Sequence, residues 1–460
     1  MFWADRDPAS DARTFLATED RALTYAQAFD AADALFDTTR GGVVAILCDK
    51  TPETVIAYVG ALRAGCVPLL LDVNAPQAAV SRTLEAYKPT YVFAPLSCEL
   101  GPADRLKIIG THGLFKSAGS EPAELFEDLA LLLPTSGSTG DPKCVRIAAR
   151  HIISCTDAVC DYLSMDQDRT AVSLLPLHYS YGLSVLHNSM SVRGKLAMTD
   201  LSVLDREFWG FMQAQRVTDL AGVPFIFDVL RRMTIPEDVV RNLACVTQAG
   251  GRLDPRITKH FLDRFADTGI SYFTMYGQTE ATPRISYVPP DKGIEKLGSV
   301  GIPISCGAVD IDGGSEGELI YRGKNVALGY AHSWKDLALG DDFGGVLKTG
   351  DLAQIDEEGY ITITGRLKRF VKLNGVSVNL DHVESVLQST GLRCLVAGQE
   401  NKIIVCYRDT AREAVDKAVT DNFGFHPSTV SLHEVADFPL TGAGKPDYAS
   451  VLKEFGGGRR

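Results

Sequence analysis

One segment of the sequence joins an apolar strand to a loop rich in glycine and hydroxyl side chains. It reads Leu132-Leu133-Pro134-Thr135-Ser136-Gly137-Ser138-Thr139-Gly140-Asp141-Pro142-Lys143. Gly137 and Gly140 allow close backbone approach, the hydroxyls and amides can donate to phosphate oxygens, and Lys143 adds a positive charge. The spacing is not that of a Walker loop, because no G-x-x-x-x-G-K-[ST] is present. The segment favours a polyphosphate site, although such a cluster alone is also typical of a solvated turn.

The same loop resembles the signature segment of the AMP-binding, adenylate-forming superfamily, which contains acyl- and aryl-CoA synthetases, luciferases and peptide-synthetase adenylation domains. Further segments resemble other motifs of that family, in the family's order along nearly the whole chain. They are L-R-A-G over 62–65 leading to Pro68, L-P-L-H-Y-S-Y-G over 175–182, A-G-G over 249–251, Y-G-Q-T-E over 276–280, T-G-D over 349–351, G-R-L-K over 365–368, K-L-N-G over 372–375 and P-L-T-G-A-G-K over 439–445. Each motif is weak alone, but together and in order they identify the chain as a member.

The resemblance implies an ATP site with Mg²⁺. Thr279 would contact the α-phosphate, Glu280 would bind the metal, and Tyr276 would stack on adenine. Asp351 would accept the ribose hydroxyls, and Arg366 would add a ribose or phosphate contact. The implied ATP-binding residues are Thr135, Ser136, Gly137, Ser138, Thr139, Gly140, Lys143, Gly250, Gly251, Tyr276, Gly277, Gln278, Asp351 and Arg366.

The resemblance also implies a catalytic lysine on a moving lid. Lys445, in a glycine-flanked loop, would bridge the acid's carboxylate and the α-phosphate, joining Thr279 and Glu280 as catalytic residues. A cation between two reacting anions lowers the barrier. Lys368 stands where the family has a hinge, which lets the lid serve adenylation and then thiol attack. Gly375 resembles the glycine beside the thiol channel, so CoA or a carrier-protein phosphopantetheine is the implied acceptor.

The substrate motif indicates which acid is activated. Amino-acid-activating members carry an Asp close to the position of Gly182, where it pairs with the substrate ammonium, so an acid without a free α-amino group is favoured. The pocket is expected to draw on His178, Tyr181, Gly182, Phe225, Gly250 and Phe273, which suggests an aromatic or medium-chain acyl acid. His178 could equally be a core histidine. Cys144 departs from the family, which usually has Gly after the loop lysine.

The elements that position these residues follow an α/β pattern. A strand over 43–48, a helix over 52–64 and a strand over 67–71 make a βαβ unit, and strands over 90–93, 129–133 and 172–175 continue the alternation. We predict a large multi-sheet α/β domain over residues 1–366, with a small β subdomain over about 290–366. A small mobile α+β lid would cover 367–460, with a helix over 380–390, strands over 394–397 and 403–407, and a hinge at Lys368.

Composition excludes several other classes of function. Lys and Arg number 46 against 58 Asp and Glu, a net charge of −12, which offers no electrostatic footprint for nucleic acid. No apolar run approaches the roughly 20 residues of a membrane-spanning helix. The ten cysteines show no C-x-x-C pair, which fits a reduced, cytoplasmic protein.

The sequence therefore predicts an AMP-forming acid–thiol ligase of the acyl- or aryl-CoA synthetase type. Its partners would be a small carboxylic acid, ATP with Mg²⁺, and either CoA or an acyl or peptidyl carrier protein. Three alternatives stay open. One is an acyl-AMP ligase that loads a dedicated carrier protein with an amino acid or fatty acid, one is a luciferase-like oxidative use of the adenylate, and one is a non-catalytic nucleotide or acid sensor.

Overall fold

The computed structural model describes residues 1–99, 103–117, 123–135, 142–373, 376–399, 401–441 and 444–456 of the chain. The fold is mixed α/β, as the sequence predicts. The chain divides into two compact units, a larger one of residues 1–308 with 322–347 and a smaller one of residues 309–321 with 348–460. The boundary predicted after residue 366, and the predicted movement of the lid about Lys368, stay predictions.

The first sheet of the larger unit has a buried, parallel centre. Its strand order is β19 (Gly329–Ala331), β9 (Cys144–Ala148), β8 (Leu129–Pro134), β4 (Val67–Asp72), β3 (Val43–Cys48), β5 (Tyr91–Pro95), β7 (His112–Ser117), β6 (Ala103–Ile109). β3 is apolar and buried at every position, which is typical of a parallel strand covered on both faces. Its side chains alternate between two cores, so that Val44 and Ile46 pack in one and Ala45 and Leu47 in the other.

The second sheet of this unit continues the parallel arrangement. Its strand order is β16 (Ile302–Pro303), β15 (Ser286–Tyr287), β14 (Ser271–Tyr276), β13 (Cys245–Gln248), β12 (Asp219–Gly222), β10 (Thr170–Ser173), β11 (Lys195–Met198), β1 (Thr14–Ala17), β2 (Ala22–Thr24). Strands β14, β13, β12, β10, β11 and β1 run parallel, and β2, β15 and β16 pair antiparallel. The carboxyl ends of the parallel strands therefore share one edge, where ligands bind in open α/β sheets.

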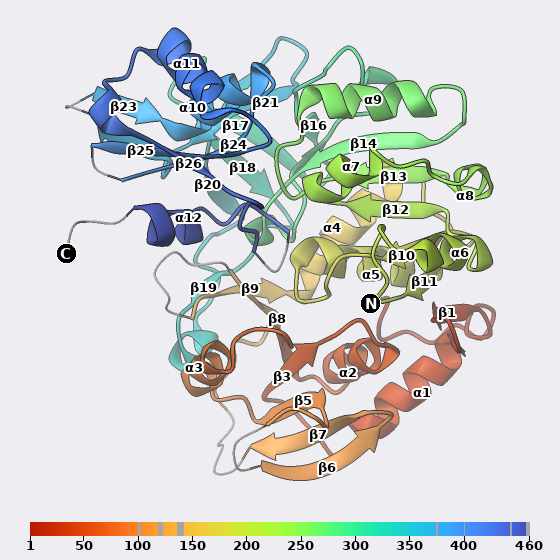
Figure 1. The fold of residues 1–460 in the computed structure, drawn as a ribbon. Helices are drawn as coiled ribbons and strands as arrows, with labels where there is room; N and C mark the ends of the chain where they lie inside the picture. Colours follow the sequence, from red (N-terminus) through yellow and green to blue (C-terminus); the bar gives the residue numbers. More distant parts are fainter. Residues whose placement is uncertain are drawn as a thin grey trace. The chain divides into compact units, whose positions relative to one another are not determined.

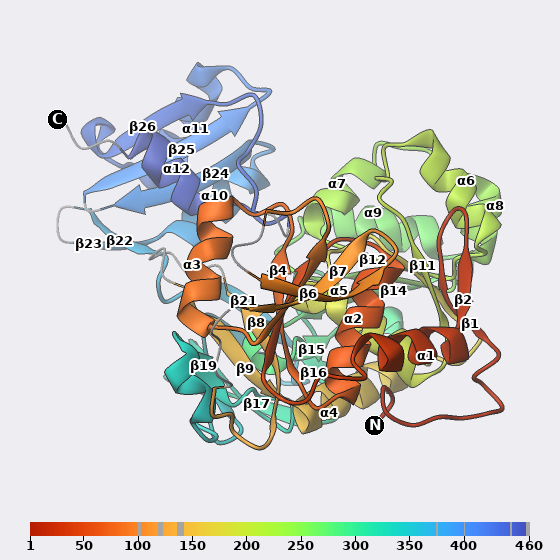
Figure 2. The ribbon, with the colours of Figure 1, turned by 90° about the horizontal axis from the view of Figure 1, so that it is seen from below.

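The helices of the larger unit cover both sheets (Figures 1 and 2). They are α1 (Tyr25–Leu35), α2 (Pro52–Arg63), α3 (Gln77–Tyr87), α4 (Ala149–Tyr162), α5 (Ser180–Ser191), α6 (Arg206–Ala214), α7 (Pro224–Leu230), α8 (Glu237–Asn242) and α9 (Pro255–Phe265), with short 3-10 turns η1 (Thr279–Ala281), η2 (Pro290–Lys292) and η3 (Trp334–Ala338). α1 and α2 pack on one face of the first sheet and α3 on the other, while α4 and α5 lie between the two sheets. Among the described residues, no helix has the length and apolar character needed to cross a bilayer.

The predicted βαβ unit is confirmed, with small shifts at element ends. The helix predicted over 52–64 is α2, which begins at Pro52 because Thr51 accepts a hydrogen bond from the amide of Thr54 and caps it. The strand predicted over 90–93 is β5, shifted to 91–95, and that predicted over 172–175 is β10, shifted to 170–173. Strand and helix ends depend on tertiary hydrogen bonds, so shifts of this size are expected.

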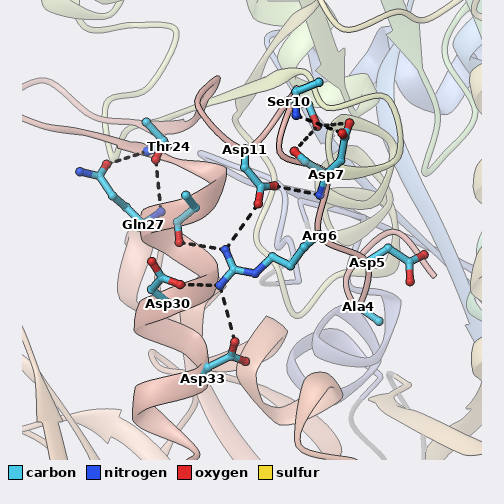
Figure 3. Close-up of polar contacts among 12 residues, drawn as sticks. Ala4, Asp5, Arg6, Asp7, Ser10, Asp11, Thr24, Gln27, Asp30 and Asp33 are labelled. Carbon is cyan, nitrogen blue, oxygen red and sulfur yellow. Dashed lines mark hydrogen bonds and ion pairs between the residues drawn. The ribbon is translucent and has the colours of Figure 1, made fainter.

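The N-terminal segment is tied to α1 by a cluster of ion pairs around Arg6 (Figure 3). The Arg6 guanidinium contacts the carboxylate of Asp30 and lies 3.6 Å from Asp11 and 3.7 Å from Asp33. Its Nη1 also donates to the carbonyl of Ala26 at 3.5 Å. Because these partners lie on successive turns of α1 and on the segment before it, Arg6 anchors the chain's start to this helix.

The smaller unit has a β part and an α+β part. The β part orders its strands β17 (Gly307–Asp312), β18 (Gly317–Gly323), β20 (Val346–Ile355), β21 (Ile361–Arg366), and is followed by the hairpin β22 (Phe370–Leu373) and β23 (Val376–Asn379). The α+β part comprises the sheet β24 (Arg393–Gln399), β25 (Lys402–Arg408), β26 (Val430–Glu434), with α10 (Leu380–Ser389), α11 (Arg412–Phe423), α12 (Tyr448–Phe455) and the turn η4 (Pro427–Thr429). Alternate residues of β25 pack against α10 and α11 or against α12, so helices cover both faces of this sheet.

A buried histidine between α2 and α5 makes stability depend on pH. The ring of His187 hydrogen-bonds the Tyr58 hydroxyl at 2.7 Å, and both side chains are buried. Burial lowers the pKa of His187 from 6.5 to about 3. Below pH 6.5 the unfolded chain therefore takes up a proton that the folded chain excludes, until the pH reaches about 3.

We expect the free energy of unfolding to fall as the pH drops below 6.5. The contribution of His187 alone should reach about 1.4 kcal/mol at pH 5.5. Urea unfolding at pH 7.5 and pH 5.5 measures this loss, and His187→Gln should show a smaller loss because its side chain takes up no proton. An equal loss in both proteins would contradict this account.

Candidate functional site

Most of the predicted ATP-site segments of the larger unit follow the carboxyl ends of strands. Residues 249–251 come after β13, residues 277–280 after β14, and Thr135 after β8 (Figure 1). Gly277 is required there by space, because a Cβ at this position would lie 1.9 Å from the carbonyl oxygen of Pro283. The chain thus folds back tightly on itself just after Tyr276, and this return presents Thr279 and Glu280 on η1.

Glu280 is joined to Lys143 through one aromatic side chain. The hydroxyl of Tyr330 donates to Oε1 of Glu280 at 2.8 Å, and the ammonium of Lys143 lies 3.3 Å from the centroid of the Tyr330 ring. Burial and the neighbouring Glu280 carboxylate raise the pKa of Tyr330, so it stays a neutral donor. The proposed metal carboxylate and the proposed phosphate lysine therefore contact the same side chain, the carboxylate at its hydroxyl and the lysine over its ring.

The segment that carries Thr279 and Glu280 is fixed by side chains distant in the sequence. Nδ2 of the buried Asn325 donates to the carbonyls of Ala281 and Arg284 at 2.5 and 2.8 Å. The hydroxyl of Thr282 donates to the Asn325 carbonyl at 2.8 Å, and the hydroxyls of Ser180 and Thr279 lie 3.0 Å apart. These bonds position the segment before any ligand arrives.

Thr135 and Lys143 lie at the end of the antiparallel pair of strands β8 and β9. The amide of Thr135 donates to the Lys143 carbonyl at 2.9 Å, and Pro134 opposes Cys144 in the β8–β9 register. The predicted phosphate-binding residues Ser136, Gly137, Ser138, Thr139 and Gly140 lie outside the described residues.

Cys144, which replaces the family's usual Gly, is part of the core. It is completely buried, and its amide donates to the Tyr87 hydroxyl at 3.0 Å, which itself donates to the Ala331 carbonyl at 2.6 Å. Burial raises the pKa of its thiol to about 12, so it is not a nucleophile at neutral pH. All ten cysteines of the chain are free thiols.

The predicted substrate residues occupy different environments. Tyr181 is buried, and its hydroxyl donates to the Thr247 carbonyl at 3.0 Å. Phe273 packs in a core cluster, whereas Phe225 on α7 is half exposed. At Gly182 a Cβ would lie 2.2 Å from the Pro176 carbonyl oxygen, so no acidic side chain fits at this position.

His178 lies in the connection between β10 and α5 and faces Asp72. Its Nε2 is 3.9 Å from Oδ2 of Asp72, and its buried Nδ1 has no hydrogen-bond partner among the described residues. Burial lowers the pKa of His178, and Asp72 offsets this only in part, so the ring is neutral at pH 7. A neutral imidazole with an unused nitrogen is compatible with a polar ligand contact as well as with a core role.

In the smaller unit, Asp351 and Arg366 face each other across β20 and β21. They are register partners, and Nε of Arg366 lies 3.1 Å from Oδ1 of Asp351. The Thr349 hydroxyl, which accepts from the Asp351 amide at 3.1 Å and donates to the Leu319 carbonyl at 2.7 Å, orients this end of β20. The carboxylate of Asp351 is thus already beside a cation.

Lys445 sits in a tight hairpin before α12. The Thr441 amide donates to the Lys445 carbonyl at 2.7 Å, the Lys445 amide donates to the Thr441 hydroxyl at 3.2 Å, and the bridge between Leu440 and Pro446 closes the loop. Lys368 is exposed between β21 and β22. Gly375, predicted for the thiol channel, lies outside the described residues.

The residue after the predicted hinge lysine is anchored within the smaller unit. Arg369 stacks on the Tyr448 ring at 3.7 Å and lies 3.1 Å from Asp381 and 3.3 Å from Glu384. Glu384, whose side chain is 13% exposed, also accepts from the Tyr448 hydroxyl at 2.8 Å. This network ties Arg369 to α10 and α12. Lys368 is therefore the last residue before the part of the chain that the network holds.

Metal binding in the larger unit would depend on the nucleotide. Among the described residues, no group of three or more His, Cys, Asp or Glu side chains could by itself hold an ion. A carboxylate such as Glu280 together with substrate phosphates is the usual environment of Mg²⁺ in nucleotide sites. Glu280, positioned by Tyr330 and close to the hairpin of Lys143, fits that arrangement.

Four functional candidates were not predicted from the sequence: Ser180, Arg284, Asn325 and Tyr330. Ser180 lies within the quoted substrate motif and Arg284 lies four residues after Glu280, so proximity to a motif was a usable signal for both. Asn325 and Tyr330 lie about 45 and 50 residues after Glu280. The pairing of β19 with β9 sets Tyr330 opposite Val145, and a bond from the Ala327 amide to the Glu280 carbonyl at 2.9 Å joins the preceding segment to Glu280.

Removing the Tyr330 hydroxyl should weaken the site without unfolding it. We expect Tyr330→Phe to lower ATP-dependent acid activation about tenfold and to raise the Mg²⁺ concentration required, because a hydrogen bond to a charged group contributes about 1.5–3 kcal/mol. Activity over a Mg²⁺ titration measures both effects. Tyr25→Phe, which removes a buried hydroxyl bonded to the Gly194 carbonyl at 2.7 Å, is the matched control and should leave the Mg²⁺ dependence unchanged. A Tyr330→Phe protein with the wild-type Mg²⁺ dependence would exclude this role.

A family model and several known proteins are similar to this chain. A family model described as AMP-binding enzyme matches residues 3–331. The oxalate–CoA ligase of Arabidopsis thaliana is 27% identical over 383 residues, covering 75% of this chain and 73% of the relative. A D-alanine–D-alanyl carrier protein ligase of Staphylococcus aureus (strain Newman) is 23% identical over 404 residues, covering 84% and 81%. The solved structure of O-succinylbenzoate coenzyme A synthetase from Bacillus subtilis, in complex with ATP and magnesium ion, matches with a TM-score of 0.74 at 21% identity over 96% of each chain.

The chain has the fold of this coenzyme A synthetase structure. The chain belongs to the AMP-binding enzyme family, whose model covers most of its length. The curated relatives named above are ligases, one for CoA and one for a carrier protein.

Proposed function

We propose that this chain is an AMP-forming acid–thiol ligase of the acyl- or aryl-CoA synthetase type. It converts a carboxylic acid and ATP to an acyl-adenylate and pyrophosphate, and a thiol then displaces AMP. The proposal rests on the arrangement of Lys143, Tyr330 and Glu280. Their contacts bring a cation and a carboxylate together beside the hairpin that we expect to hold polyphosphate.

In the first half-reaction a carboxylate oxygen of the acid attacks the α-phosphorus, and the bond from that phosphorus to the bridging oxygen of pyrophosphate breaks. Lys445 is the cation between the two anions, and Thr279 holds an α-phosphate oxygen. Mg²⁺, when bound by Glu280, supplies charge neutralisation of the polyphosphate. Tyr276 stacks on adenine, and Asp351 exchanges its Arg366 partner for the ribose hydroxyls.

In the second half-reaction a thiolate attacks the acyl carbon and AMP leaves with the bonding electrons. A free thiol has a pKa near 8.5, so a few per cent is thiolate at neutral pH without a dedicated base. Rotation of the lid about Lys368 moves Lys445 away from the adenylate and presents the thiol channel. The named relatives transfer to CoA in one case and to a carrier protein in the other, so both acceptors belong in the test.

Acid-dependent ATP–pyrophosphate exchange over a panel of aryl, short, medium and long acyl, dicarboxylic and amino acids tests the proposal. We expect exchange with one class of acid, followed by thioester formation when CoA or a phosphopantetheinylated carrier is added. Tight ATP binding with no exchange for any acid would favour the sensor alternative. Exchange with amino acids alone would favour the carrier-loading alternative.

A further inference from the structure

A small cavity lies between α4, α5 and the strands β12, β13 and β14 of the larger unit. Its volume is about 30 Å³, room for a group of a few atoms. Leu163, Val185, Ala221 and Met275 contribute apolar walls, and Tyr181, the predicted substrate residue, contributes an aromatic one.

The cavity contains a guanidinium that the protein does not neutralise. Arg284 is 2% exposed and among the largest completely buried side chains of the chain. Its Nε has no hydrogen-bond partner, and no carboxylate of the described residues forms an ion pair with the group. The guanidinium instead lies 4.9 Å from the centroid of the Tyr181 ring. Since arginine does not lose its proton in proteins, a positive charge is present here.

Most other polar groups at the cavity already have partners, although the buried Oδ1 of Asn188 has none among the described residues. Asp219, which also lines it, is held by Arg169 through two bonds of 2.8 and 2.5 Å, so its charge is matched. The Tyr181 hydroxyl donates to the Thr247 carbonyl at 3.0 Å. No hydrogen bond joins Nε of Arg284 to any of the described residues, so the cavity keeps a net positive charge.

The backbone of Arg284 belongs to the segment that carries the proposed catalytic residues. Its amide donates to the Ala281 carbonyl at 3.0 Å, and its carbonyl accepts from Asn325 at 2.8 Å. Thr279 and Glu280 stand at the other end of that segment. An acid whose carboxylate reacts at Thr279 could therefore extend its far end toward Arg284.

We propose that Arg284 is a specificity-determining residue and that the acid substrate is a small dicarboxylic acid. One carboxylate is activated, and the second enters the cavity and pairs with the Arg284 guanidinium, which presents a planar donor fork suited to a carboxylate. The inference rests on the proposed function. It differs from the aromatic or medium-chain acyl acid that the sequence predicts, because the burial of Arg284 cannot be read from the sequence.

The test compares acids matched in chain length that differ only in their second carboxylate. Initial rates of ATP–pyrophosphate exchange are measured for butanoate against butanedioate, pentanoate against pentanedioate, and benzoate against the benzenedicarboxylates. Wild type should prefer the best diacid over its partner by at least about 10²-fold in kcat/KM, because a buried unpaired polar group rejects an analogue that lacks its partner. Arg284→Met should reverse this preference, and Arg284→Lys should keep the direction with a smaller ratio.

Thermal stability separates recognition from a structural role. Arg146 is also completely buried, but it bonds to the carbonyls of Tyr330 and Gly340 at 3.0 Å each and contacts Asp342. Arg146→Met should lower the Tm, whereas Arg284→Met should leave it unchanged or raise it, since no protein partner is lost.

Three results would overturn the inference. A wild-type preference for the monoacids shows that Arg284 does not select a diacid, and the ligase function then stands. A lowered Tm with equal loss for both acids in Arg284→Met assigns the residue to structure. The absence of exchange with every acid in wild type removes the proposed function itself, and the inference with it.

Discussion

Lys445→Ala is expected to lower the rate of acyl-adenylate formation by about 10²- to 10³-fold. The lysine is the proposed cation between the attacking carboxylate and the α-phosphorus, and loss of one such group in a water-excluded site has effects of this size. Its hairpin is closed by backbone bonds between Thr441 and Lys445 and by the bridge from Leu440 to Pro446, which do not involve the ammonium. The variant should therefore fold normally.

The two half-reactions distinguish a catalytic lysine from a general defect. ATP–pyrophosphate exchange reports the first step, and thioester formation from a supplied acyl-adenylate reports the second, which should stay within a few-fold of wild type. Lys453→Ala, which changes an exposed lysine on α12, is the matched control and should not alter either step. Equal losses in both half-reactions would show that Lys445 does not act as proposed.

Glu280→Gln is expected to reduce adenylation by about 10²- to 10³-fold at limiting Mg²⁺ and to recover part of the loss at high Mg²⁺. The substitution keeps an oxygen that can accept from the Tyr330 hydroxyl, now 2.8 Å away, but removes the negative charge that would hold the metal. The change is therefore electrostatic, and the segment held by Asn325 should be preserved.

A Mg²⁺ titration of exchange activity, at fixed ATP and acid, measures the effect. Glu237→Gln removes a carboxylate that pairs with Arg241 on the surface helix α8 and should behave as wild type. If Glu280→Gln has an undiminished apparent affinity for Mg²⁺, the carboxylate does not serve the metal and its role must be sought in the bond to Tyr330.

Local pattern in the sequence was sufficient for much of the larger unit. The apolar run from Val43 to Cys48, the capped helix at Pro52 and the next apolar run at Val67 are all found as predicted. These elements depend on side-chain periodicity and on caps within a few residues, which are properties of neighbouring positions. The same holds for the helix predicted over 380–390, which is α10.

The candidate site was predictable as a set of segments but not as a set of contacts. The loops after β8, β13 and β14, and Lys445, were predicted from their resemblance to the family's motifs. The side chains that support them were not predicted, because contacts such as the bond from Tyr330 to Glu280 join residues that lie far apart in the sequence. The order of strands in a sheet is a long-range property that a single sequence does not display.

The sequence by itself determined the family and the α/β class, and it predicts the segments that would hold ATP. Only the tertiary structure decided that Gly182 faces the Pro176 backbone and that Arg284 is buried with no carboxylate partner among the described residues. The physical reason is that motif chemistry resides in adjacent residues, whereas burial and charge compensation depend on which distant elements pack together. For this protein the motifs predict the reaction, whereas our proposal for the class of acid rests on the packing around Arg284.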